Sequence, residues 1–169
     1  MRNEISIKIL QQLLKNSKKS DRELAKAIGV SQATFTRRRK QLEKKVIQEY
    51  TITPNLYELG FEILAFTFIR IREPKVDFLE KARQSLTKRH NIIFASGGEG
   101  LGMEAIAISV HKDYTSYINY ISEARGEWTG IVLDLQSFLV SLKGDFEAKA
   151  FSLKPLAEIL PDIIVQKKL

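Results

Sequence analysis

The sequence predicts an α+β protein in which an N-terminal winged helix-turn-helix precedes a ferredoxin-like βαββαβ domain. Three observations predict this architecture: a basic first third, two capped helices joined by a very short turn, and a change in hydrophobic period after Pro54. We expect a helical domain, a linker, a domain of strands and helices, and a C-terminal extension, which cover residues 1–53, 54–61, 62–145 and 146–169.

Charge is distributed unevenly along the chain. Residues 1–53 contain 13 Lys and Arg against 5 Asp and Glu, a net charge of +8, whereas residues 54–169 have a net charge of −1. A basic helical head on a nearly neutral body is typical of a protein that binds a polyanion with one end. The chain has no cysteine, which excludes disulfides, thiolate metal sites and a cysteine nucleophile.

Local signals predict three helices in the basic part. The first follows from apolar residues at helical spacing, which are Ile5, Ile9, Leu10, Leu13 and Leu14. The segment from Ser20 to Glu23 is a capping box that begins the second helix, and Gly29 ends it. Ser31 caps the third helix, which we expect over residues 32–43. So short a glycine-containing turn between two helices is the helix-turn-helix signature.

The end of the basic part is rich in β-prone residues. We expect a strand or small wing over Val46–Ile52, ended at Pro54. A domain of about 50 residues is marginally stable by itself. We therefore expect it to be supported by its neighbour or by a second copy of the chain.

Strands and helices alternate after the linker. The expected order is strand, helix, strand, glycine-rich loop, strand, helix and one or two further strands, over residues 63–72, 76–89, 92–95, 97–102, 103–110, 113–125 and within 131–142. This is the order of the ferredoxin-like fold. In the extension, Phe151 and Leu153 suit an edge strand, and Leu156–Leu160 suits a short helix before Pro161.

The third helix carries most of the residues expected to bind DNA. An α-helix fits the major groove, and side chains near its N-terminal end reach base edges. Base contacts are expected from the first turns of this helix, at Ser31, Gln32, Thr34 and Thr36, followed by Arg37 and Arg38. Phosphate contacts are expected from Arg22, Lys40, Lys44 and Lys45. The alternative for the four consecutive cations is an ordinary solvated helix face.

Arg39 does not fit this pattern, because it lies between Phe35 and Leu42 on the inward side of the helix. Either its stem lies along the core with its head in water, or the helix is rotated from the expected orientation.

The segment SDRELAKAIGVSQATFTRRRKQLEKKVIQEYTITPNLYELGF resembles the Lrp/AsnC family of bacterial and archaeal transcription regulators. The resemblance implies a winged helix-turn-helix joined to a βαββαβ ligand-sensing domain, with sheet-to-sheet pairing of the sensing domains. The chain departs from the family pattern in three places. Lys45 stands where the family usually has glycine, Arg39 stands where it usually has an aliphatic residue, and the glycine-rich loop is longer.

The resemblance also implies an amino-acid effector bound near that loop, at an interface between dimers. The corresponding residues of this chain are Gly97, Gly98 and Glu104. The four glycines of residues 97–102 could let backbone amides approach an anionic ligand such as a carboxylate. Alternatively, they form a hairpin connection with no ligand.

Together these features predict a sequence-specific, DNA-binding transcription regulator without a catalytic residue, metal or cofactor. Its expected partners are double-stranded DNA, itself as a homodimer or an assembly of dimers, and a small amino-acid-like ligand. The alternatives are an Lrp/AsnC-like enzyme of tetrapyrrole metabolism with a vestigial helix-turn-helix, or a ligand sensor without DNA binding. His90 and His111, the only histidines, fall in different elements and make a weak case for catalysis.

We expect a cytoplasmic location with no membrane partner. The N-terminus is interrupted by charges and is not a signal peptide. The longest mainly apolar stretch, Ile63–Ile71, is too short to cross a bilayer.

Overall fold

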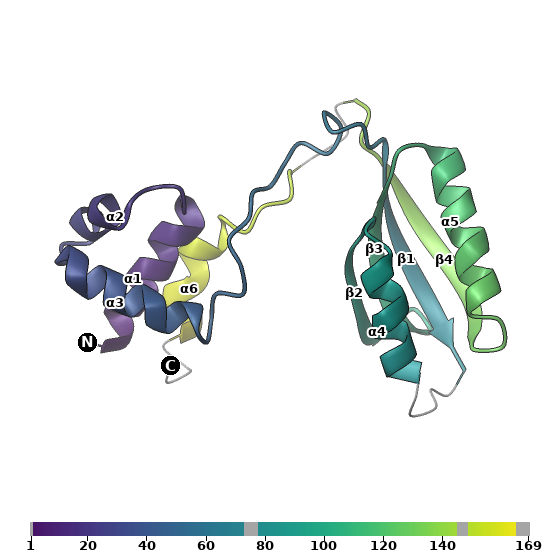
Figure 1. The fold of residues 1–169 in the computed structure, drawn as a ribbon, viewed down its shortest axis with the longest axis horizontal. Coiled ribbons are helices and arrows are strands. Elements are labelled where there is room, and N and C mark those ends of the chain that lie inside the picture. Colours follow the sequence, from purple (N-terminus) through teal and green to yellow (C-terminus); the bar gives the residue numbers. More distant parts are fainter. Residues whose placement is uncertain (1, 73–77, 145–148, 165–169) are drawn as a thin grey trace. The chain divides into compact units, whose positions relative to one another are not determined.

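The computed structural model describes residues 2–72, 78–144 and 149–164 and divides the chain into two compact units (Figure 1). The helical unit consists of the described residues up to Thr53 together with those from Ala150 onward. The sheet unit consists of Pro54–Lys149. Among the described residues, no helix is both long and apolar enough to cross a membrane.

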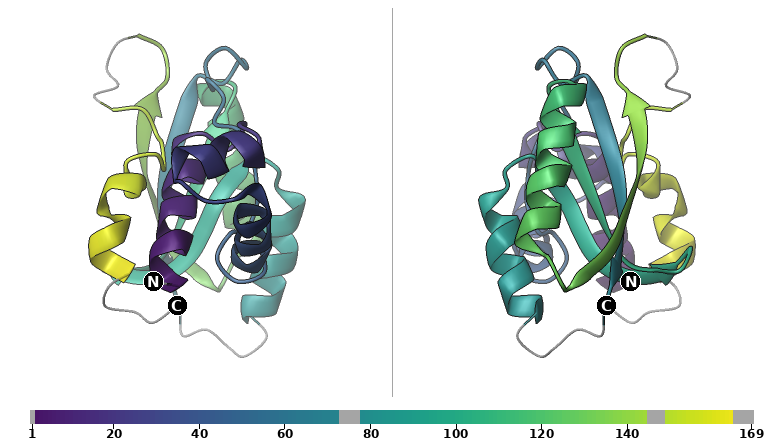
Figure 2. Two further views of the ribbon diagram at one scale, coloured as in Figure 1. Left: turned by 90° about the vertical axis from the view of Figure 1, so that its left-hand side faces the viewer. Right: turned by 90° about the vertical axis from the view of Figure 1, so that its right-hand side faces the viewer.

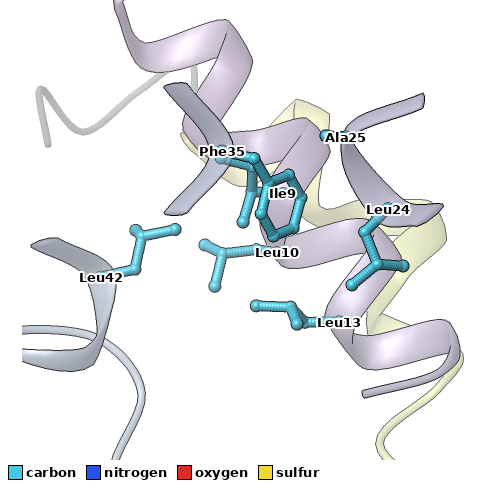
Figure 3. Close-up of a cluster of buried hydrophobic side chains, with 7 residues drawn as sticks. All are labelled: Ile9, Leu10, Leu13, Leu24, Ala25, Phe35 and Leu42. Atoms are coloured by element: carbon cyan, nitrogen blue, oxygen red, sulfur yellow. The ribbon is translucent and has the colours of Figure 1, made fainter. Parts of the chain in front are cut away.

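The helical unit is built on four helices, which are α1 (Arg2–Lys15), α2 (Asp21–Ala27), α3 (Gln32–Glu43) and α6 (Leu156–Ile164). Its core is formed where α1, α2 and α3 meet (Figure 3). Ile9 and Phe35 are fully buried there, and Leu24 is 1% exposed. Burial of a large apolar side chain stabilises a fold by roughly 1.5–3 kcal/mol, so these three side chains fix α3 against the other two helices.

The helix-turn-helix signature of the sequence is confirmed. The Ser20 hydroxyl accepts a hydrogen bond from the Glu23 amide at 3.3 Å, and the Glu23 carboxylate accepts one from the Ser20 amide at 2.8 Å. Gly29 has a φ of +71°, the left-handed conformation that glycine adopts at little cost. Ser31 then caps α3 by accepting a hydrogen bond from the Thr34 amide.

The strand predicted over Val46–Ile52 is wrong for the described chain, since no residue of this segment is in a strand. Backbone bonding explains the difference. The amides of Lys45, Val46 and Ile47 all donate to the Leu42 carbonyl at the end of α3, at 3.1, 2.7 and 2.9 Å. β-prone side chains make a strand only where a partner strand is available, and the described residues provide none here.

The C-terminal extension contributes to the helical unit. Its predicted helix is present as α6, whereas the edge strand predicted at Phe151 and Leu153 is wrong, because those residues lie outside any strand. Ala157 on α6 is fully buried, and its carbonyl accepts a hydrogen bond from the Gln11 side chain at 2.8 Å. Lys15 and Glu158 form an ion pair at 2.9 Å. Helix α6 therefore packs on α1 and adds to a small helical core.

The sheet unit has the ferredoxin-like topology that the sequence predicts. Its strands are β1 (Ile63–Ile71), β2 (Ile92–Gly100), β3 (Met103–His111) and β4 (Val132–Ser141), and its helices are α4 (Phe78–Lys88) and α5 (Tyr114–Glu127). The strand order is β2-β3-β1-β4, and every pairing is antiparallel.

Both helices of the sheet unit lie on one face of the sheet (Figure 2). Ala65 of β1 packs against Tyr117 and Ile121 of α5. Arg89, which directly follows α4, is linked to α5 by ion pairs with Glu123 at 3.5 Å and Glu127 at 2.6 Å. The opposite face carries a row of apolar side chains set by the strand register, which are Leu64, Phe66, Phe68, Phe94, Ile106, Ile108, Val110, Phe138 and Val140. Within the described sheet unit no helix covers this apolar face.

The glycine-rich loop predicted over residues 97–102 is wrong in extent. Strand β2 continues through the glycines, since Gly97 pairs with Ala105 and Gly100 with Met103. Only Leu101 and Gly102 form the turn, with φ values of 53° and 68°. Glycine keeps the backbone donor and acceptor of any residue, so cross-strand pairing overrides its low strand propensity.

Candidate nucleic-acid interface

One face of α3 forms an open groove of about 660 Å³ lined by Gln32, Ala33, Thr36, Arg37 and Lys40. Gln32, Thr36 and Lys40 recur every four residues, as do Ala33 and Arg37, and this spacing places all five on the same side of the helix. The opposite side carries Phe35 and Leu42, which are 0% and 6% exposed. A polar and cationic face is therefore presented on a helix that its own core holds in place.

Several hydroxyl groups predicted to contact bases bond within the helical unit. The Ser31 hydroxyl donates to the Thr34 hydroxyl at 2.9 Å in addition to its role as a helix cap. The Thr36 hydroxyl donates to the Asp21 carboxylate at 2.6 Å, although Thr36 lines the groove. Among the predicted base contacts at Ser31, Gln32, Thr34 and Thr36, Gln32 is the residue that is both exposed and in the groove.

The predicted cations have different environments. Arg37 and Lys40 are exposed and line the groove. Arg38 is half-buried; it donates to the Gln41 side chain at 3.1 Å, and its buried Nε has no hydrogen-bond partner among the described residues. Three further predicted phosphate contacts are exposed but lie outside the groove lining, namely Arg22, Lys44 and Lys45.

Arg39 adopts neither of the two placements expected from the sequence. Its guanidinium forms ion pairs with Asp21 at 2.7 Å and Glu43 at 3.0 Å, and it also donates to the Tyr50 hydroxyl at 3.0 Å. The side chain is only 22% exposed. The spacing of four between Arg39 and Glu43 is visible in the sequence. Asp21 and Tyr50 are distant from Arg39 in the sequence, and the fold brings both into contact with it.

The Asp21 carboxylate is stabilised in its charged form. Partial burial acts to raise its pKa, but hydrogen bonds from Thr36 and Arg39, with the charge of Arg39, together hold the pKa below its ordinary value. Asp21 therefore carries its negative charge at neutral pH and stays paired with Arg39.

The predicted effector residues lie at the hairpin between β2 and β3. Gly97 and Gly98 are exposed in β2, which is an edge strand of the sheet. The Glu104 carboxylate accepts a hydrogen bond from the Ile71 amide at 2.8 Å. Arg70 donates to the Gly102 carbonyl at 2.9 Å, so the hairpin is fastened to the end of β1.

The two histidines, which fall in different elements, line one cleft of about 440 Å³ in the sheet unit. His111 Nε2 lies 2.8 Å from the Ser109 hydroxyl, a contact that the sequence did not predict. Ser109 is 0% and His111 is 3% exposed, and burial lowers the pKa of His111. His111 lines the cleft but Ser109 does not, so the hydroxyl of this pair is not presented to the cleft. Arg89, at the rim of the same cleft, is paired with Glu127 at 2.6 Å.

Known proteins resemble this chain in its helix-turn-helix and over most of its length. A family model described as winged helix-turn-helix DNA-binding matches residues 2–45. The HTH-type transcriptional regulator Ptr1 of Methanocaldococcus jannaschii is 32% identical over 126 residues, which cover 73% of this chain and 81% of Ptr1. The HTH-type transcriptional regulator LrpA of Pyrococcus abyssi is 30% identical over 125 residues, which cover 73% of this chain and 85% of LrpA.

Solved structures share the fold. A transcriptional regulator of Neisseria meningitidis in complex with L-Met superposes with a TM-score of 0.75 at 22% identity, covering 88% of this chain and 92% of that one. An AsnC family transcriptional regulator from Agrobacterium tumefaciens gives the same TM-score at 17% identity, covering 88% and 93%. The helix-turn-helix and its exposed groove, with these relatives, define a DNA-binding transcription regulator. The chain belongs to the Lrp/AsnC family.

Proposed function

We propose that α3 is the recognition helix of this regulator. The side of α3 that carries Gln32, Arg37 and Lys40 would enter the major groove of duplex DNA. The observation that carries the proposal is the alignment of Gln32, Arg37 and Lys40 on one exposed face of a helix anchored by Phe35. Gln32 is suited to pair with adenine and Arg37 with guanine, because each side chain can form two hydrogen bonds to the edge of that base. Lys40 is suited to bind phosphate.

The remaining cations give affinity without sequence choice. Arg22, Lys44 and Lys45 are exposed on the same helical unit and are available to phosphates. Arg38 is half-buried, and we assign it to a phosphate at the edge of the interface. Because each neutralised phosphate releases counterions, binding should weaken steeply as salt concentration rises.

The test begins with selection of bound fragments from the organism's own genome, which yields a preferred duplex. Arg37→Ala should weaken binding to that duplex about tenfold or more, measured by fluorescence anisotropy at moderate salt. Lys81→Ala is the matched control, because Lys81 is an exposed cation on α4 in the sheet unit. Equal affinity of the Arg37→Ala variant and the unchanged protein would contradict the assignment.

We infer that the regulator works as a homodimer joined through the apolar face of its sheet. Phe94 and Phe138 are 51% and 66% exposed on this face in the single chain. Patches of large apolar side chains are typical of interfaces between copies. Two-fold pairing also presents two recognition helices to an operator with two half-sites.

We further propose a small amino-acid-like effector at the exposed edge formed by Gly97 and Gly98, close to Glu104. A Cβ added at Gly98 would meet nothing within 4 Å, so open space adjoins the backbone there. The related fold from Neisseria meningitidis was solved with L-Met, which supports an amino acid as the class of ligand.

A panel of single amino acids tests the effector proposal. One of them should raise the melting temperature of the unchanged protein. Gly98→Val fills the open space and should abolish that rise while leaving the melting temperature without ligand nearly the same. A rise that survives in the Gly98→Val variant would contradict this location.

A further inference from the structure

We propose that Arg39 is a positioning residue for DNA recognition, which fixes the angle of α3 through a polar junction with Asp21, Glu43 and Tyr50. The proposal rests on the proposed role of α3 and adds a residue that does not itself touch DNA. Arg39 stands in the middle of the recognition helix, but its head group points to other parts of the helical unit.

The junction joins three segments of the chain. Arg39 Nη1 pairs with Asp21 Oδ1 on the first turn of α2 at 2.7 Å, and Arg39 Nε pairs with Glu43 Oε1 on α3 at 3.0 Å. Tyr50, in the irregular segment after α3, donates its hydroxyl proton to Glu43 at 2.9 Å. The Arg39 guanidinium also lies over the Tyr50 ring, 4.8 Å from its centroid. The planar guanidinium fork suits several fixed partners at once.

Arg39 is poorly placed to contact a phosphate. It is absent from the groove lining, and its side chain is 22% exposed. Its Nη1 and Nε donate to two carboxylates, so one cation is set against two negative charges in the junction. A phosphate would be repelled there, unlike at Arg37 or Lys40.

The junction nevertheless reaches the groove through a shared carboxylate. Asp21 accepts one hydrogen bond from Arg39 through Oδ1 and another from Thr36 through Oδ2, at 2.6 Å. Thr36 lines the groove. Loss of Arg39 would remove an ion pair that helps to set the angle between α3 and α2, and would leave the Asp21 charge without its cation beside the DNA-binding face. An Asp21 carboxylate without its cation at this position would make DNA binding less favourable.

The junction also links α3 to the exit from the helical unit. Tyr50 lies three residues before Thr53, where the helical unit gives way to the sheet unit. A displacement of this segment would therefore disturb the hydrogen bonds of Tyr50 with Arg39 and Glu43, and through them the position of the recognition helix. Tyr50→Phe keeps the ring but removes the hydroxyl, which isolates this part of the junction.

The test compares Arg39→Leu, Arg39→Lys, Asp21→Asn and Tyr50→Phe with the unchanged protein. The probe is the duplex selected from the genome, with a random-sequence duplex of equal length as reference, and affinities are measured from low to moderate salt. Circular dichroism and thermal melting establish that each variant is folded. Lys81→Ala again serves as the control.

A positioning role has three expected signatures. Arg39→Leu loses about tenfold or more in affinity for the selected duplex and less for the random one, with an unchanged slope of log affinity against log salt. Arg39→Lys recovers only part of the loss. Asp21→Asn also weakens selective binding, although removal of a negative charge should strengthen attraction to DNA in general. Tyr50→Phe gives a smaller loss in the same direction.

Other outcomes overturn the inference. A salt slope reduced by about one in Arg39→Leu would make Arg39 a direct phosphate contact. Full affinity of folded Arg39→Leu, or tighter binding by folded Asp21→Asn, would remove the positioning role. If Arg39→Leu does not fold, Asp21→Asn and Tyr50→Phe decide by the same criteria. Failure of the unchanged protein to prefer any duplex would instead overturn the proposed interface.

Discussion

Leu101 occupies a backbone conformation that suits it poorly. It is the one non-glycine residue with a positive φ among those described, at 53°, and it forms the hairpin turn between β2 and β3 with Gly102. Positive φ at both central residues is the mark of a type I′ turn, in which Asn-Gly is favoured. The Leu101 side chain is 80% exposed, so burial does not offset the unfavourable conformation.

We therefore expect Leu101→Asn to stabilise the protein. The left-handed region costs an ordinary side chain about 1–2 kcal/mol, and Asn relieves part of this through local hydrogen bonding, so a gain of about 1 kcal/mol is expected. Chemical denaturation of the two proteins measures it. Leu59→Asn is the control, because Leu59 is 61% exposed but has an ordinary backbone conformation. An equal gain in both variants would show that it comes from replacing an exposed apolar side chain, and not from the backbone conformation at Leu101.

Arg39 illustrates what sequence reasoning can find at a single residue. The helical period alone identified it as a cation on the inward side of the helix. Its real partners required the fold, since Asp21 precedes it by 18 residues and Tyr50 follows it by 11. Thr36 is similar, because its position favoured a base contact while the structure engages its hydroxyl with Asp21. Local patterns therefore predict the face of a helix better than they predict the bonds made there.

Helices with local caps are the elements that the sequence predicts best. The capping box at Ser20 and Glu23 and the cap at Ser31 use bonds between residues three apart, so the pattern contains both partners. Strands depend on distant partners. Val46–Ile52 has strand propensity but pairs with no described strand, whereas Gly97 and Gly100 lack that propensity and pair with β3. The strand predicted at Val46–Ile52 and the loop predicted at the glycines are wrong for the same reason. A strand forms only where a second strand is available to pair with it.

The C-terminal helix shows a second limit at the level of elements. Its existence could be predicted from its apolar residues, but its partner could not. Ala157 is small and unremarkable in the sequence, yet it is fully buried where α6 meets α1. The support expected for a small helical domain is thus supplied in part by the far end of the same chain.

At the scale of the whole molecule, the two faces of the sheet are unequal. One face packs on α5 through Ala65 and Leu139. On the other, Phe138 is 66% exposed on the edge strand β4, where it ends a cross-strand row of apolar side chains with Phe66 and Ile108. Apolar surface of this kind is stabilised when a second copy covers it, at roughly 25 cal/mol for each Å² removed from water. This asymmetry is the structural basis of our proposal that two copies pair through the sheet.

Phe138→Asp tests the pairing directly. A carboxylate on an apolar face covered by a second copy would be desolvated without a partner, so we expect the dimer to dissociate and the mass measured by light scattering to fall to that of a monomer. The single chain should remain folded, because Phe138 is already mostly exposed within it. Affinity for the selected duplex should fall as well, since two linked recognition helices bind more tightly than one. Tyr114→Asp is the control, because Tyr114 is 61% exposed on α5, on the opposite side of the sheet. An unchanged mass for Phe138→Asp would show that the copies meet elsewhere, and an equal loss in both variants would show a general effect of added charge.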